Sequence, residues 1–232
     1  MRYFISDCHF FHESLNVQMD NRGFASGEEM NAYMLAQWNG RVHPRDEVII
    51  LGDLSVGKPE ESNALLDQLN GHLCLVRGNH DYFGRKRHYR TDRFDWIRDY
   101  VELKDNHRKL ILCHYPIMFY NGQYRYRIPK TGGLDQLEGG EAQDAPRSGN
   151  DDAPSAPDRD SLPPTTYMLY GHVHDTVDER LMRRFIAETR RTERLDRDGR
   201  PYHIPCHMIN CFCMFSDYVP LTLDEWIEND RQ

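Results

Sequence analysis

The chain lacks any apolar run long enough to cross a membrane, because a spanning helix needs about 20 predominantly apolar residues and no such stretch occurs. The first apolar residues follow directly after Met1 and Arg2, which leaves no room for a secretory signal peptide. The 6 Cys residues are scattered, mostly within apolar stretches, which argues against the disulfide framework of a small secreted protein. Together these absences predict a cytoplasmic protein without a membrane partner.

The chain also has fewer basic than acidic residues. Lys and Arg total 29 against 37 Asp and Glu, and the formal net charge of −8 argues against extended nucleic-acid binding. The two paired Cys units of a zinc ribbon are also missing, although Cys206, Cys211 and Cys213 lie near His203 and His207. We therefore expect residues 207–215 to form a late strand whose alternate residues pack inside.

The chain shows no internal repeat, and its 232 residues suffice to bury one core. We expect 1–232 to form a single domain with two additions. Residues 132–164 are rich in Gly, Asp, Ser, Pro and Ala, a composition that predicts a flexible insertion. This insertion is either a mobile lid or a loop expansion without function.

Three helices are expected. The pattern Ser26-x-x-Glu29 is typical of a capping box and predicts a helix that begins near Ser26, and a second helix is expected over 60–69. The added segment 178–205 contains an Arg- and Glu-rich amphipathic helix as far as about 198, followed by a turn-rich return. The residues expected on the apolar side of this helix are Leu181, Phe185 and Ile186.

The most informative pattern in the chain recurs five times: a short apolar run is followed directly by Asp, Asn or His residues, side-chain types that commonly bind metals. Run 3–6 precedes Asp7 and His9, run 48–51 precedes Gly52 and Asp53, run 73–76 precedes Gly78, Asn79, His80 and Asp81, run 110–112 precedes His114, and run 167–170 precedes Gly171, His172 and His174. Ligands of an α/β protein bind at the carboxyl ends of its strands, so the repetition predicts one site assembled from several strand ends.

The donor types narrow the chemistry. Asp, Asn and His without Cys suit two divalent ions such as Mn, Fe, Zn or Ni. Taken alone, each cluster also has an ordinary structural role; Gly52-Asp53, for example, is typical of a turn. The presence of five such clusters, each directly after a predicted strand, is what indicates a two-metal hydrolase.

The ordered set D-x-H, G-D, G-N-H-D, H and G-H-x-H resembles the motifs of the calcineurin-like metallophosphoesterase superfamily. The sequences around Asp7 and 218–226 are similar to a compact bacterial and phage branch of small phosphoesterases. The resemblance implies a metallo-dependent phosphatase-like α/β fold, a four-layer α-β-β-α sandwich of two mixed sheets flanked by helices.

The resemblance also implies roles for individual residues. One metal would be held by Asp7, His9, Asp53 and His174, and the other by Asp53, Asn79, His114 and His172, with Asp53 bridging the two. His80 would lie near the substrate phosphate or the leaving group. Asp81, next to it, is expected either to support the His80 ring as part of the catalytic pair or to cap a turn.

Two dications about 3.5–4 Å apart clamp the attacking and leaving oxygens of an in-line displacement at phosphorus. A hydroxide that bridges the metals would be the nucleophile, so no Ser or Cys nucleophile is needed. We favour a phosphodiester or nucleotide as the substrate, because the chain is small and carries no evident protein-docking module. The alternatives are a phosphomonoesterase or protein phosphatase, and a catalytically silent metal-binding scaffold; the oligomeric state is left open.

Three further residues are candidates for substrate contact. His12 follows His9 by three positions and is either a substrate or outer-layer contact or an ordinary histidine. Tyr124 and Arg125 belong to a stretch in which aromatic and cationic residues alternate. Such side chains stack on bases and pair with phosphates, so this stretch is our candidate for substrate selection.

Overall fold

Parallel strands build the first half of the molecule. The structure, a computed structural model, describes residues 1–125 and 165–230. Strands β1 (Arg2–Ile5), β2 (Glu47–Ile50), β3 (His72–Val76) and β4 (Phe94–Arg98) pair in this order, and every pairing is parallel. Their carboxyl ends therefore meet at one edge of the sheet, as the repeated motif step required.

The second sheet is mixed. Its order is β10 (Met208–Asn210), β7 (Thr166–Tyr170), β6 (Arg108–Cys113) and β5 (Tyr100–Asp105). The pairings β10–β7 and β7–β6 are parallel, and β5 pairs antiparallel with β6. Backbone hydrogen bonds join the two sheets beyond their strand ends, because Ser6 N–H donates to Cys211 O and Cys213 N–H donates to Ser6 O.

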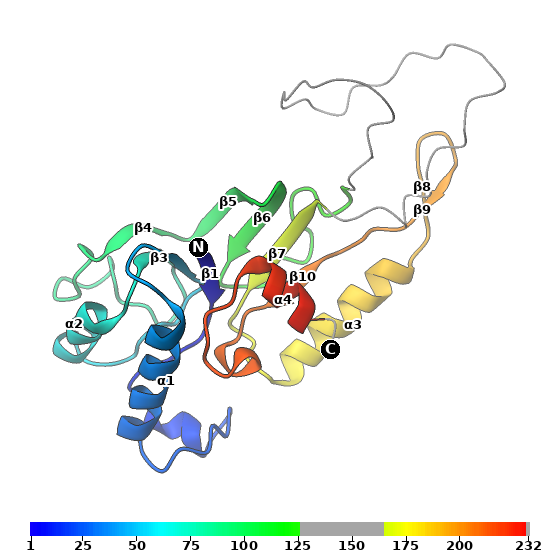
Figure 1. Cartoon of the computed structure of the whole chain (residues 1–232). Coiled ribbons are helices and arrows are strands. Elements are labelled where there is room, and N and C mark those ends of the chain that lie inside the picture. The colour runs from blue at the N-terminus through cyan, green and yellow to red at the C-terminus, as the bar shows by residue number, and fades with distance from the viewer. Residues whose placement is uncertain (126–164, 231–232) are drawn as a thin grey trace.

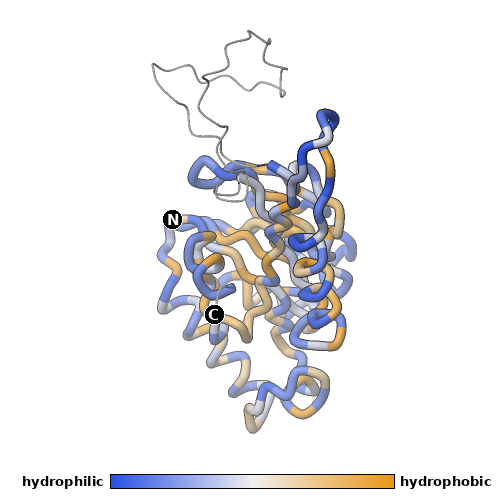
Figure 2. Tube along the Cα trace, turned by 90° about the vertical axis from the view of Figure 1, so that its right-hand side faces the viewer, coloured by the Kyte–Doolittle hydropathy of each residue, from blue (hydrophilic) through white to orange (hydrophobic). Residues whose placement is uncertain are grey.

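Alternate side chains of the strands point to opposite faces of each sheet, so the core consists of three apolar clusters: one between the two sheets and one on the outer face of each sheet. Phe4, Ile49 and Leu51 of the first sheet pack with Leu112 and Leu169 of the second. The opposite face of the first sheet packs on helices α1 (Gly27–Arg41) and α2 (Pro59–Gln68), and the opposite face of the second packs on α3 (Val177–Arg191). Figure 1 shows these helices on the outer sides of the two sheets, and Figure 2 shows apolar residues concentrated in the interior of the trace. The expected four-layer α-β-β-α sandwich is confirmed.

The first two helices form where the sequence predicts them. The Ser26 hydroxyl accepts a hydrogen bond from Glu29 N–H at 3.1 Å and caps α1. The Glu29 carboxylate accepts from Ala25 N–H, one residue before the position that a full capping box uses. Helix α2 begins at Pro59, the position where a missing N–H costs nothing.

Two local expectations were wrong. Helix α3 ends at Arg191 and is followed by a short hairpin of β8 (Arg194–Leu195) and β9 (Pro201–Tyr202). Of the three residues expected on the apolar side of α3, Ile186 is buried and Phe185 packs against the core, but Leu181 is 52 % exposed, and Glu179 and Met182 are buried with Ile186. The late strand is only β10, because after Phe212 the chain turns into a 3₁₀ helix, η3 (Cys213–Ser216).

The remaining elements complete the domain. A 3₁₀ helix, η1 (Glu13–Asn16), follows the first motif loop, and helix α4 (Leu223–Asn229) packs its Trp226 into the layer between the sheets. Within 1–125 and 165–230, no helix is both long and apolar enough to cross a membrane. The expected insertion at 132–164 lies outside the described residues.

Candidate metal centre

All predicted metal ligands lie in loops that leave the carboxyl ends of five strands. Asp7 and His9 follow β1, Asp53 follows β2, Asn79 follows β3, His114 follows β6, and His172 and His174 follow β7. These loops leave their strands sharply. Five of the seven candidate ligands have a positive φ: Asp7 (55°), His9 (49°), Asp53 (55°), His172 (73°) and His174 (47°). Such angles are uncommon outside glycine and cluster where a site fixes side-chain direction.

One half of the site is buried. Asp7, His9 and His174 are 0 %, 2 % and 3 % exposed, and each offers a ligand atom within 4.8 Å of the others. His9 Nε2 lies 3.2 Å from His174 Nε2, and His174 Nε2 lies 3.5 Å from an Asp7 carboxylate oxygen. Burial raises the pKa of Asp7, so its anionic form is held at a cost that a nearby cation would relieve.

The other half opens toward the surface. The Asn79 Oδ1 atom lies 3.0 Å from His114 Nε2 and 3.0 Å from His172 Nδ1. His114 is fully buried, and its Nδ1 lies 2.9 Å from Leu51 O, which orients Nε2 toward the site. His172 is exposed, so this half is accessible to a ligand from solvent.

Asp53 connects the halves. Its Oδ2 atom lies 3.5 Å from His9 Nε2 and 3.5 Å from His114 Nε2. A second group of possible ligand atoms within 4.8 Å consists of Asp7, Asp53 and His114. One carboxylate between two sets of imidazoles is the arrangement that the bridging hypothesis requires.

The electrostatics of Asp53 and His114 favour a cation between them. Burial alone would raise the pKa of Asp53, but the hydrogen bond and charge of His114 lower it to about 2. Burial alone would lower the pKa of His114, but Asp53 and Asp7 raise it to about 9. The carboxylates thus stabilise positive charge at this point. A set of Asp, Asn and His donors that includes two buried carboxylates fits divalent metal ions.

His80 lies beside the candidate ligands without being one of them. It is exposed, its ring centroid lies 5.2 Å from that of His9, and its backbone N–H donates to Asp53 Oδ1 at 2.8 Å. His12 is half-buried on the same side, with its ring 5.4 Å from His9 and 6.4 Å from His80. Both rings therefore border the place where a substrate would meet the metals.

Asp81 caps backbone groups of two motif loops. Its carboxylate is fully buried and accepts hydrogen bonds from the backbone N–H groups of Asp53 (2.8 Å), Leu54 (3.0 Å) and Gly78 (2.7 Å). Burial and the Asp53 charge raise the pKa of Asp81 to about 6. Asp81 joins two motif loops through their backbones, which agrees with the capping alternative; all three of these hydrogen bonds come from backbone groups and none from the His80 ring.

The proposal of substrate contacts at Tyr124 and Arg125 is also corrected. Thr165 N–H donates to Arg125 O at 3.3 Å, and Thr165 immediately precedes β7. The candidate ligand His172 follows the other end of β7, and a five-residue strand spans about 17 Å. Both side chains are exposed at the edge opposite the site.

Two features of the site escaped sequence reasoning. Asp20, in the loop before α1, places Oδ1 2.7 Å from His174 Nδ1, and no motif marks this position. Tyr115 directly follows His114; its ring lies 5.0 Å from the His114 ring and 4.6 Å from the His172 ring and is 45 % exposed. Its position next to a motif histidine was the only available signal.

Comparison with known proteins agrees with this geometry. The family model of the calcineurin-like phosphoesterases matches residues 3–190, a span that contains every candidate ligand. The chain belongs to this family. An uncharacterized protein, MJ1445, of Methanocaldococcus jannaschii is 44 % identical over 86 residues, which are 36 % of this chain and 48 % of that protein. The chain thus spans about half the length of this relative.

A solved structure shows a similar fold. The protein of unknown function AQ665 from Aquifex aeolicus superimposes with a TM-score of 0.51 over 98 % of each chain, at 21 % identity. At this identity the likeness supports the fold alone. The activity must therefore be inferred from the residues of the site itself.

Proposed function

We propose that this protein is a two-metal phosphoesterase that hydrolyses phosphodiesters or nucleotides. The observation that carries the proposal is the position of Asp53, whose Oδ2 atom lies 3.5 Å from a histidine of each half of the site. Asp7, His9 and His174 would hold one ion, Asn79, His114 and His172 the other, and Asp53 both. When bound, such ions supply Lewis-acid activation of water and neutralise charge at the phosphoryl group.

The protein's own residues provide the remaining chemistry. His80 is exposed beside the candidate ligands, where its ring can donate a hydrogen bond to a phosphoryl oxygen or a proton to the departing alkoxide. Its backbone N–H donates to Asp53 Oδ1, which ties the position of His80 to the carboxylate proposed to bridge the ions. His12 lines the same side and would contact the substrate beyond the phosphate.

Tyr115 supports a substrate with an organic group on the phosphate. The exposed ring lies against His172 and His114, so it flanks the phosphate position and offers a face for stacking. Aromatic rings stack on any nucleobase, which favours nucleotides or aryl diesters over phosphoproteins.

The test is hydrolysis by metal-stripped protein supplied with Mn²⁺, Ni²⁺, Zn²⁺ or Fe²⁺. Bis-p-nitrophenyl phosphate is compared with p-nitrophenyl phosphate, and Asp53→Asn serves as the matched variant. We expect metal-restored diesterase activity that the variant lacks, because its amide cannot bridge two ions as a carboxylate does. Monoesterase preference would instead indicate a phosphatase. Two bound ions without turnover of either ester would indicate a scaffold.

A further inference from the structure

The loop between η1 and α1 places a carboxylate behind one of the candidate ligands. Asp20 Oδ1 lies 2.7 Å from His174 Nδ1, and the two side chains are 1 % and 4 % exposed. A carboxylate can only accept, so Nδ1 carries the proton and Nε2 presents its lone pair. That Nε2 atom is the one that faces His9 and Asp7.

A buried guanidinium holds Asp20 in place. Arg22 Nε donates to Asp20 Oδ2 at 2.9 Å, and its side chain is fully buried. The same guanidinium donates to the backbone carbonyls of Cys8 at 2.7 Å and Asp7 at 3.0 Å. Arg22 and Asp20 therefore connect the loop of Asp7 and His9 to the ring of His174, which lies 154 residues from Asp20 in the sequence.

The Asp20–Arg22 pair contacts only the half of the site that Asp7, His9 and His174 form. In the other half, His114 Nδ1 faces a neutral partner, the carbonyl of Leu51, at 2.9 Å. His172 is exposed, and its Nδ1 faces Asn79 Oδ1. Among the described side chains around these two rings, the structure shows no carboxylate in a position equivalent to that of Asp20.

We propose that Asp20, fixed by Arg22, is a positioning residue that strengthens metal binding at the position formed by Asp7, His9 and His174. The inference rests on the proposed function, since it needs metals at this site. A carboxylate hydrogen-bonded to a ligating imidazole fixes its tautomer and raises its basicity, and loss of such a partner costs about 10- to 100-fold in metal affinity. Because Asp20 contacts only one half, the effect is selective.

Calorimetric titration of metal-free protein with Mn²⁺ tests the proposal. We expect Asp20→Asn to weaken one of the two binding steps by about 10- to 100-fold and to leave the other unchanged. The control is Asp67→Asn, which removes an exposed carboxylate paired with Arg90 and should change neither step. Unchanged affinity in Asp20→Asn, or equal weakening of both steps, would overturn the positioning role. Wild-type protein that binds no divalent ion would instead refute the proposed function.

A second measurement does not depend on the folding of a variant. Asp20→Asn leaves the buried Arg22 cation beside a neutral amide, and an unpaired buried charge can destabilise the fold of the variant. The wild-type protein is therefore also examined by nitrogen-15 NMR of its histidine rings. We expect the metal-free His174 ring to be protonated at Nδ1, with that proton shifted downfield by the carboxylate; His174→Gln assigns the signal. A His174 ring protonated only at Nε2 would contradict the proposal.

Discussion

At the scale of single residues, His80 separates catalysis from metal binding. Its ring borders the ring of His9, and among the described residues it belongs to neither group of possible ligand atoms that lie within 4.8 Å of one another. His80→Gln should therefore retain both ions and lose about 10²- to 10⁴-fold in kcat, the usual contribution of a general acid or base. Metal analysis beside steady-state kinetics checks this. The control is His88→Gln, an exposed histidine a few residues along the same segment. Loss of metal from the His80 variant would show that its role has been misassigned.

Tyr115 allows a second prediction at this scale. If its exposed ring stacks on the organic group of the substrate, Tyr115→Ala should raise KM for a nucleoside diester about 5- to 150-fold, the effect of about 1–3 kcal/mol of base stacking. Tyr115→Phe keeps the ring and should behave like the wild type. An alkyl diester offers no ring to stack, so its KM should change little. Equal losses on both substrates would assign Tyr115 to packing against His172.

At the scale of elements, glycines allow the motif loops to approach one another closely. A Cβ atom on Gly171 would lie 2.3 Å from Asp7 Oδ2 and 2.6 Å from Ser6 Cβ. Gly171→Ala must therefore displace Asp7, and we expect a large loss of metal affinity. Gly40, in α1, is the matched control because nothing lies within 4 Å of its Cβ position. Gly40→Ala should leave metal binding unchanged and raise the free energy of unfolding by about 0.5–1 kcal/mol, measured by chemical denaturation.

The strands and helix α3 differ in how well the sequence predicts them. The order of strands and motif residues was predictable because each apolar run and its polar end are contiguous in the chain. The orientation of α3 was not. Glu179 occupies an inward position because its carboxylate accepts hydrogen bonds from Tyr170 Oη at 2.9 Å and Asn210 Nδ2 at 3.1 Å. Apolar periodicity places a glutamate outside, so the expected apolar side included Leu181, which is exposed, and left out Glu179. Asp20 was missed for a related reason, since its partner is distant in sequence.

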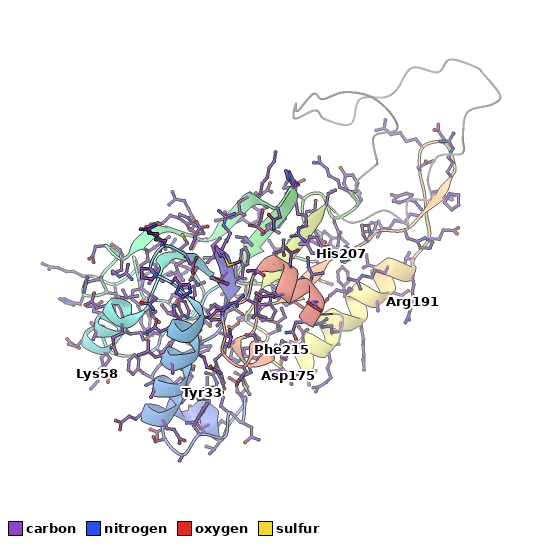
Figure 3. All side chains as sticks on the ribbon, viewed as in Figure 1. Tyr33, Lys58, Asp175, Arg191, His207 and Phe215 are labelled. Atoms are coloured by element: carbon purple, nitrogen blue, oxygen red, sulfur yellow. The ribbon has the colours of Figure 1, made fainter. Side chains whose placement is uncertain are left out.

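At the scale of the whole molecule, an ion pair joins the last helix, α4, to the first, α1. Glu225 of α4 pairs with Arg41 at the end of α1 and also accepts from Thr222 N–H at 2.8 Å. Figure 1 shows α4 close to the centre of the molecule, and Figure 3 labels Phe215 in the segment that precedes α4. Directly after α4, Asp230 pairs with Arg183 of α3. The C-terminal segment thus contacts both halves of the sandwich.

This pairing predicts a pH dependence of stability. Burial alone would raise the pKa of Glu225, but the hydrogen bonds from Thr222 and the charge of Arg41 lower it below 4.5. A carboxyl group with a lowered pKa in the folded state stabilises that state above its unfolded pKa, and the contribution is lost as the pH falls through the folded value. Glu225→Gln should therefore be less stable than the wild type at neutral pH, and the difference should disappear as the pH falls through the lowered pKa of Glu225 in the folded protein.

Because Arg41 and Glu225 are 35 % and 38 % exposed, solvent screens the pair, and we expect the difference at neutral pH to stay near or below about 1 kcal/mol. Urea denaturation between pH 7 and the acid limit, with a chelator present, measures it without a contribution from metal release. Glu228→Gln, on an exposed position of the same helix, is the control and should give no such pH-dependent difference. A stability difference for Glu225→Gln that persists unchanged into acid would mean that side-chain shape, rather than charge, joins α4 to α1.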